Sequence, residues 1–154
     1  WLSEVNAITT AMNCMKDKAA MHVIAPLHML ASKTPQYFIS KVKNNELPDM
    51  LAKMEESLRQ YNPYDWLWQL KALMNHDLFK QFGGSEKKTA QAVRAKLLII
   101  IVEQDYMVNP EPSLNFARLT DAETLKIKSD CGHYSFICEI PTLQKAISSF
   151  LGKP

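Results

Sequence analysis

The stretch KLLIIIVEQDYMVNP, residues 96–110, decides the fold of this chain. Six apolar residues, Leu97–Val102, follow one another without a break, and most of them are β-branched. This pattern is typical of a strand buried on both faces of a parallel sheet, because a buried helix would need a longer run. The apolar run ends shortly before Asp105, and Asn109-Pro110 follows as a turn signal. Asp105 is therefore expected just beyond the carboxyl end of a strand, where open α/β sheets place their functional groups.

A histidine occupies the equivalent place after a second expected strand. Residues 124–128 alternate as a short strand, and His133 follows within the segment SDCGH. If the two strands lie near each other in one parallel sheet, Asp105 and His133 can meet at its edge, within about 2.6–3.2 Å. The carboxylate would then fix the imidazole tautomer and stabilise the imidazolium that forms when His133 takes a proton from a nucleophile. A lone histidine after a loop glycine more often serves the turn, but the paired placement favours catalysis.

The N-terminal part of the chain is expected to be helical. Pro26 divides Val5–Ala31 into two helices or kinks one. Thr34-Pro35 and Asn62-Pro63 each combine an N-cap residue with proline at the first helical position. Between them, an amphipathic helix begins near Pro48.

The helix that begins at Pro63 is expected to carry Leu67, Leu70, Met74 and Leu78 on one face and to end at Gly83-Gly84. Short helices are expected before the first strand, between the strands, and at residues 141–151. The sequence thus predicts an all-helical part, residues 1–84, and a strand–helix–strand–helix part, residues 85–154.

Composition excludes several classes of partner. Eighteen basic and 16 acidic residues leave a net charge of +2 without a basic block, so neither nucleic acid nor an anionic membrane is indicated as a partner. No stretch is long enough for a membrane span, and no signal peptide opens the chain, which favours a cytoplasmic location. Because the first residue is Trp1 rather than methionine, we expect the natural N-terminus to lie outside the sequence.

The cysteines are expected to be reduced thiols. Cys14, Cys131 and Cys138 are odd in number and lack CxxC spacing, which argues against a disulfide framework or a zinc site. Cys131 is two positions from His133 and is an alternative nucleophile, although neighbours in a tight turn project differently.

The remaining histidines are not expected to bind metal, and Asp77 is a weaker candidate for the acid than Asp105. His22, His28 and His76 lack the i, i+4 spacing of a metal site. Asp77 lies next to His76 in a helical segment, whereas Asp105 follows a strand, where the site rule of α/β sheets places the acid.

Residues 93–151 resemble the C-terminal portion of the α/β-hydrolase fold, whose triad runs Ser, Asp or Glu, His along the chain. The resemblance is carried by the buried strand, by EQDYMVNP and CGH, and by SFICE with the closing helix. Within that fold, NPYDWLWQLKALMNHDL, residues 62–78, resembles the lid segment of the homoserine O-acetyltransferase family. The resemblance implies a helical lid at residues 1–84, a hydrolase core portion at 85–154, Asp105 as catalytic acid, His133 as catalytic base, and no cofactor.

Two departures from the family pattern define what this chain lacks. Homoserine-acylating members usually carry Asp directly after the catalytic histidine, where this chain has Tyr134, so the acyl acceptor is left open. No GxSxG motif exists, and the four glycines, at 83, 84, 132 and 152, could not build one. The resemblance therefore implies that the nucleophile and oxyanion hole lie N-terminal to the lid.

Two functions from different classes remain. In the first, the chain supplies the acid, the base and the lid of a serine-dependent esterase or O-acetyltransferase that acts on a small acyl ester or acyl-thioester. Its expected partner is the N-terminal half of the same enzyme or a second copy of the chain, because the apolar strand needs a neighbour. In the second, the chain is a non-catalytic interaction module or remnant that associates through its open sheet and helical layer.

Overall fold

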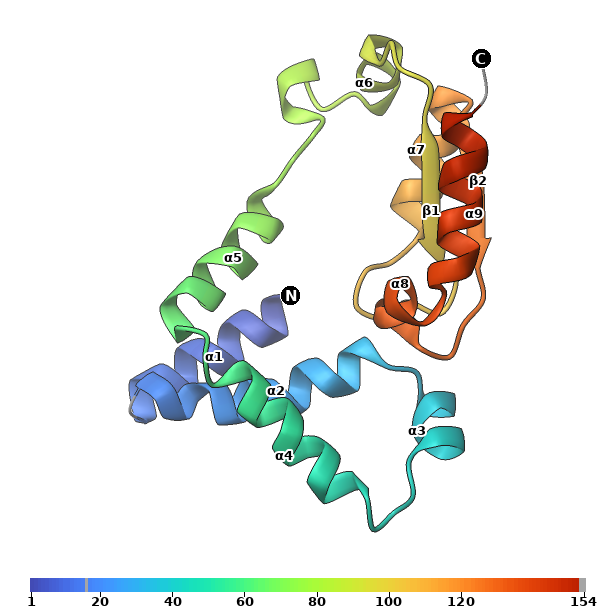
Figure 1. The fold of residues 1–154 in the computed structure, drawn as a ribbon. Coiled ribbons are helices and arrows are strands. Elements are labelled where there is room, and N and C mark those ends of the chain that lie inside the picture. Colours follow the sequence, from blue (N-terminus) through green and yellow to red (C-terminus); the bar gives the residue numbers. More distant parts are fainter. Residues whose placement is uncertain (16, 153–154) are drawn as a thin grey trace. The chain divides into compact units, whose positions relative to one another are not determined.

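A computed structural model describes residues 1–15 and 17–152 of the chain. The chain divides into two compact units, Trp1–His76 and Asp77–Pro154, which are described separately below. We call them the helical unit and the sheet unit (Figure 1). The expected boundary at Gly83-Gly84 lies inside the sheet unit.

The helical unit is built around one central helix, α2. Its helices are α1 (Leu2–Cys14), α2 (Asp17–Ser32), α3 (Pro35–Lys41), α4 (Leu47–Leu58) and α5 (Pro63–Asn75). Helix α2 packs against α1, α4 and α5, and α1 also packs against α5. The resulting core comprises Ile8, Ala11, Ala20, Met21, Ile24, Ala25, Leu58 and Leu67.

Both expected cap-plus-proline starts are confirmed. The Thr34 hydroxyl accepts a hydrogen bond from the Tyr37 amide at the start of α3, and the Asn62 side chain accepts one from the Tyr64 amide at the start of α5. Each cap satisfies an amide that the first turn of a helix otherwise leaves unpaired. The amphipathic helix near Pro48 is also present, as α4.

Two expected helix ends in this unit are wrong. Pro26 lies inside α2, so the division expected there is wrong, whereas a kink at Pro26 stays a prediction. The break between the two helices comes earlier, where α1 ends and Met15 is extended. Helix α5 stops at Asn75 with an extended His76, well before the glycines, so the expected apolar face is incomplete. Leu67 and Leu70 are buried, whereas Met74 and Leu78 are exposed.

The sheet unit contains a parallel strand–helix–strand motif. Strands β1 (Leu98–Val102) and β2 (Glu123–Ile127) pair in register, with Leu98 opposite Glu123 and Val102 opposite Ile127. Helix α7 (Glu111–Thr120) connects them and packs on both (Figure 1). The remaining elements are η1 (Lys80–Phe82), α6 (Glu86–Ala92), η2 (Gly132–Tyr134), α8 (Ser135–Cys138) and α9 (Ile140–Leu151).

Strand β1 is less covered than its sequence predicts. Within the described residues β1 pairs with β2 alone, in a two-stranded sheet. Ile101 is 6% exposed, but the other four residues of β1 are only half-buried. The expected strand is confirmed, and the burial of both its faces is not found within the described part of this chain.

Candidate active site

The loop after β1 holds Asp105 in a fixed orientation. Its Oδ1 atom accepts hydrogen bonds from the Met107 and Val108 amides at 2.9 and 2.8 Å, so the side chain folds back over its own turn. The Asp105 amide in turn donates to the Val102 carbonyl at 3.3 Å. These bonds engage one carboxylate oxygen and leave Oδ2 for another partner.

The loop after β2 presents His133 from a short turn. Gly132 has φ of +59°, a left-handed conformation that glycine adopts without steric cost, and it opens η2. The fully buried Ser135 hydroxyl donates to the Gly132 carbonyl at 2.6 Å. Gly132 before His133 and the Ser135 hydrogen bond after it fix the backbone on either side of His133.

Asp105 and His133 meet as the sequence predicts. The distance between Asp105 Oδ2 and His133 Nδ1 is 2.9 Å, and the two side chains are 12% and 30% exposed. An ionised carboxylate only accepts hydrogen bonds, so Nδ1 carries the proton of the neutral ring. The remaining ring nitrogen, Nε2, is then a free acceptor, which is the arrangement a general base requires.

A second contact ties the two loops together. The Gln104 side-chain carbonyl accepts a hydrogen bond from the Ser129 amide at 2.9 Å. Gln104 directly precedes Asp105, and Ser129 begins the loop that leads to His133. Sequence patterns did not single out Gln104 or Ser135, because a side chain bonded to a backbone group leaves no periodic or motif signal.

An apolar cavity of about 360 Å³ borders the Asp105–His133 pair. Apart from that pair, Asn109 and Ser113, its lining is apolar and comes from β1, β2, the loop after β1, α8 and the start of α9. The Phe136 ring centroid lies 6.3 Å from that of His133, in an edge-on arrangement. Apolar surroundings strengthen a hydrogen bond such as the one between Asp105 and His133.

The other histidines make structural contacts. His22 lies against Glu55 and Arg59, which joins α2 to α4. His28 Nδ1 lies 3.2 Å from Glu4 Oε1, which joins α2 to α1, and His76 follows the last turn of α5. Within residues 1–15 and 17–152, no group of three or more His, Cys, Asp or Glu residues could hold a metal ion.

Asp77 has a role in the chain turn before η1. Its Oδ1 atom accepts hydrogen bonds from the Phe79 and Lys80 amides at 2.9 and 3.2 Å. Within the described residues, Asp77 makes no side-chain hydrogen bond or ion pair with a histidine. The geometry therefore favours Asp105 as the acid partner.

The expectation that all three cysteines are free thiols is wrong. Cys131 and Cys138 form a disulfide with a Cα–Cα distance of 6.5 Å, and Cys14 is free and exposed. Counting cysteines tests for a framework of long-range bridges, whereas this bridge is local. The turn and the short helix between the two cysteines fold them back onto each other. In this state Cys131 has no thiolate, so it cannot serve as a nucleophile.

Comparison with solved structures identifies the fold to which this chain is similar. The structure matches homoserine O-acetyltransferase from Bacillus anthracis with a TM-score of 0.81 and 16% sequence identity, over 97% of this chain and 47% of that one. It also matches an acetylester hydrolase from Corynebacterium glutamicum, with a TM-score of 0.65 and 14% identity, over 86% and 42% of the two chains. The chain has part of the α/β-hydrolase fold. Its two parallel strands and its helices are a portion of that fold, as the sequence predicts.

Sequence relatives of this α/β-hydrolase portion are acyltransferases. A probable acyltransferase from Methanothermobacter thermautotrophicus is 29% identical over 139 residues, which are 89% of this chain and 40% of that protein. A homoserine O-succinyltransferase from Acidithiobacillus ferrooxidans is 26% identical over 101 residues, which are 62% of this chain and 26% of that protein. No protein-family model matches the sequence. The chain thus spans less than half the length of the relatives it matches.

No helix within residues 1–15 and 17–152 has the length and apolar character needed to cross a membrane.

Proposed function

We propose that this chain provides the acid, the base and the lid of a serine-dependent acyl-transfer enzyme, an esterase or an O-acyltransferase. The observation that carries the proposal is the hydrogen bond between Asp105 and His133 at the carboxyl ends of adjacent parallel strands. The similarity to acyltransferases supports it. Asp105 would hold His133 in the Nδ1–H tautomer, and His133 Nε2 would take the proton of a serine hydroxyl during attack on an acyl carbonyl.

The substrate class follows from the chemistry of this pair. A proton taken from the serine can be returned by His133 to a leaving alcohol or thiol, so both acyl esters and acyl-thioesters suit the site. The apolar cavity beside the pair would accommodate a short acyl chain. The lid, which we assign to residues 1–84, would then decide between hydrolysis and transfer by controlling the access of water.

The proposal also requires a serine nucleophile and a strand that covers the open edge of β1. No GxSxG motif occurs in the 154 residues, so we place the serine in a segment that precedes Trp1, or in another chain. The incompletely covered β1 supports this placement, because an adjacent strand would cover it. A second copy of the chain is the other occupant that this edge could accept.

The test compares two histidines in the gene product that contains these residues together with the coding sequence upstream. The readout is kcat/KM for a small activated acetyl ester. His133→Ala should lower kcat/KM by about 10³-fold or more, because the general base is lost. His76→Ala removes an exposed histidine at the end of α5 and should leave kcat/KM unchanged. Equal rates in the two variants would refute the assignment of His133.

A further inference from the structure

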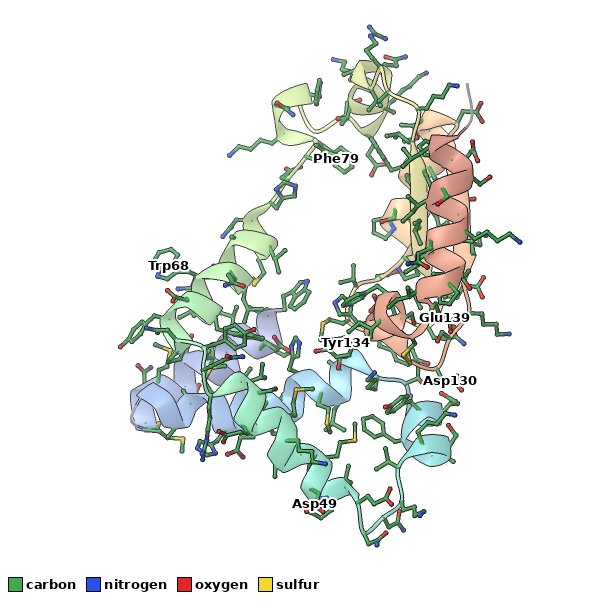
Figure 2. All side chains as sticks on the ribbon, in the orientation of Figure 1. Asp49, Trp68, Phe79, Asp130, Tyr134 and Glu139 are labelled. Atoms are coloured by element: carbon green, nitrogen blue, oxygen red, sulfur yellow. A yellow bond between two sulfur atoms is a disulfide. The ribbon has the colours of Figure 1, made fainter. Side chains whose placement is uncertain are left out.

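One disulfide joins the two ends of the short segment that carries His133. Cys131 precedes η2, and Cys138 ends α8, so the Cys131–Cys138 bond encloses Gly132, His133 and Tyr134 together with most of α8. Tyr134 is labelled within this segment in Figure 2, and Asp130 and Glu139 are labelled directly outside it. We propose that Cys131 and Cys138 are a reversible thiol–disulfide site that positions His133. The proposal rests on the function proposed above.

The disulfide adds a covalent constraint to the hydrogen bond that His133 Nδ1 makes with Asp105 Oδ2. Local hydrogen bonds also hold this segment, from the Ser135 hydroxyl to the Gly132 carbonyl and from the Cys131 amide to Ser129 Oγ at 3.4 Å. Helix α8 has only four residues, and Phe136 and Ile137 on it are more than half exposed. A short segment with few buried apolar contacts opens easily on its own. A covalent closure restricts the backbone positions that His133 can adopt.

Exposure makes the bond accessible to thiols in solution. Cys138 is exposed and Cys131 is half-buried. Exposed disulfides are the ones that exchange readily with thiols in solution. The chemical class of reagent is therefore a low-molecular-weight thiol or dithiol for opening, and a low-molecular-weight disulfide for closing.

The exchange balances as an ordinary two-electron thiol–disulfide reaction. A reagent thiolate attacks the exposed Cys138 sulfur, the bond between the two cysteines breaks, and Cys131 leaves as a thiolate that takes a proton. A second reagent thiol attacks the mixed disulfide on Cys138, releasing the oxidised reagent and the Cys138 thiol. Two electrons pass from the reagent thiols to the protein. The reverse sequence, with a small disulfide as oxidant, closes the site.

The expected consequence concerns the tautomer of His133. With the disulfide closed, His133 stays on Asp105 and its neutral ring carries the proton on Nδ1. With the disulfide open, the turn samples other positions, and the Nδ1–H population falls toward the mixture of a free imidazole. Catalysis by the base falls with it, because the correct tautomer is a condition for proton transfer.

The experiment combines imidazole ¹⁵N spectra with thiol alkylation and mass spectrometry on the full protein. Under a small disulfide, Cys131 and Cys138 should resist alkylation and His133 should be the Nδ1–H tautomer. Under a dithiol, both cysteines should be alkylated and the Nδ1–H population should drop. Cys138→Ser under oxidising conditions should match the reduced protein, and Cys14→Ser, which alters the free exposed thiol, should match the wild type in both states.

The possible results separate this inference from the proposed function. A bond that never forms, or that resists the dithiol in the native protein, overturns reversibility. An Nδ1–H tautomer that persists unchanged after reduction overturns the positioning of His133 while leaving the Asp105–His133 assignment intact. Absence of the Nδ1–H tautomer in both states overturns the inference and the proposed function together.

Discussion

The Nδ1 atom of His133 lies 2.9 Å from Oδ2 of Asp105, although 28 positions separate the two residues along the chain. Each follows one of two paired parallel strands, so the pairing of β1 with β2 brings the loops together. The other Asp105 oxygen is occupied by the Met107 and Val108 amides. The imidazole therefore has one defined partner and one free nitrogen.

Asp105→Asn tests whether catalysis requires a carboxylate as the partner of His133. An amide of the same size can donate to the ring as well as accept from it, so it no longer selects the Nδ1–H tautomer. We expect kcat of the complete enzyme to fall by about 10³–10⁴-fold, with little change in thermal stability. Asp77→Asn is the matched control, because Asp77 only caps a turn in the sheet unit. A larger loss in the control would transfer the role of the acid to Asp77.

Gln104→Leu tests the tie between the two loops. The substitution removes the acceptor of the Ser129 amide, and a lost hydrogen bond of this kind costs about 0.5–1.5 kcal/mol of unfolding free energy. Chemical denaturation followed by circular dichroism measures the change. Glu103→Leu, at an exposed neighbouring position, should change the free energy of unfolding by less than about 0.5 kcal/mol. Equal effects in both variants would show that the Gln104 contact contributes nothing.

The 154-residue chain by itself should not turn over a small activated ester. It has no GxSxG serine, and in the structure Cys131 is bonded to Cys138, so neither of these nucleophiles is available to form the covalent acyl intermediate. A spectrophotometric assay at micromolar concentration checks this expectation. Turnover that appears after reduction and disappears with a thiol-blocking reagent would instead identify a cysteine nucleophile.

Strand β1 predicts association of the isolated chain. Four of its five residues are only half-buried, and a fully buried aliphatic side chain contributes about 1.5–3 kcal/mol, so covering this strand provides a large driving force. Sedimentation velocity at micromolar concentration should show a dimer, or a complex with the N-terminal segment when that segment is present. A monomer whose Leu98–Val102 amides are protected from hydrogen exchange would contradict this prediction.

The strands and the Asp105–His133 contact were predictable because their signals are local. An apolar run marks the first strand and alternation marks the second, parallel pairing is implied by the helix between the strands, and the strand ends fix where Asp105 and His133 must lie. The two helix starts at Thr34 and Asn62 were predictable for the same reason, because a cap and a proline act within one turn.

The course of the chain at Pro26 and the disulfide were not predictable, because tertiary packing decides the first and the conformation of one local turn decides the second. A proline inside a helix costs about 3 kcal/mol. In α2 the fully buried Met21, Ile24 and Met29 each contribute about 1.5–3 kcal/mol, so packing exceeds the proline cost and the helix continues through it. Apolar character alone does not show which residues are buried: Trp68 on α5 is 67% exposed and projects from the helix (Figure 2). The pairing of Cys131 with Cys138 depends on a turn that no spacing rule describes.

The most direct measurement is identification by mass spectrometry of the residue that a fluorophosphonate labels in the gene product containing these residues and the coding sequence upstream. We predict one labelled serine, within a GxSxG motif ahead of Trp1. Labelling should be lost in His133→Ala and retained in His76→Ala. Labelling that persists in His133→Ala, or that falls on a residue within the 154, would contradict the claim that Asp105 and His133 activate a serine nucleophile.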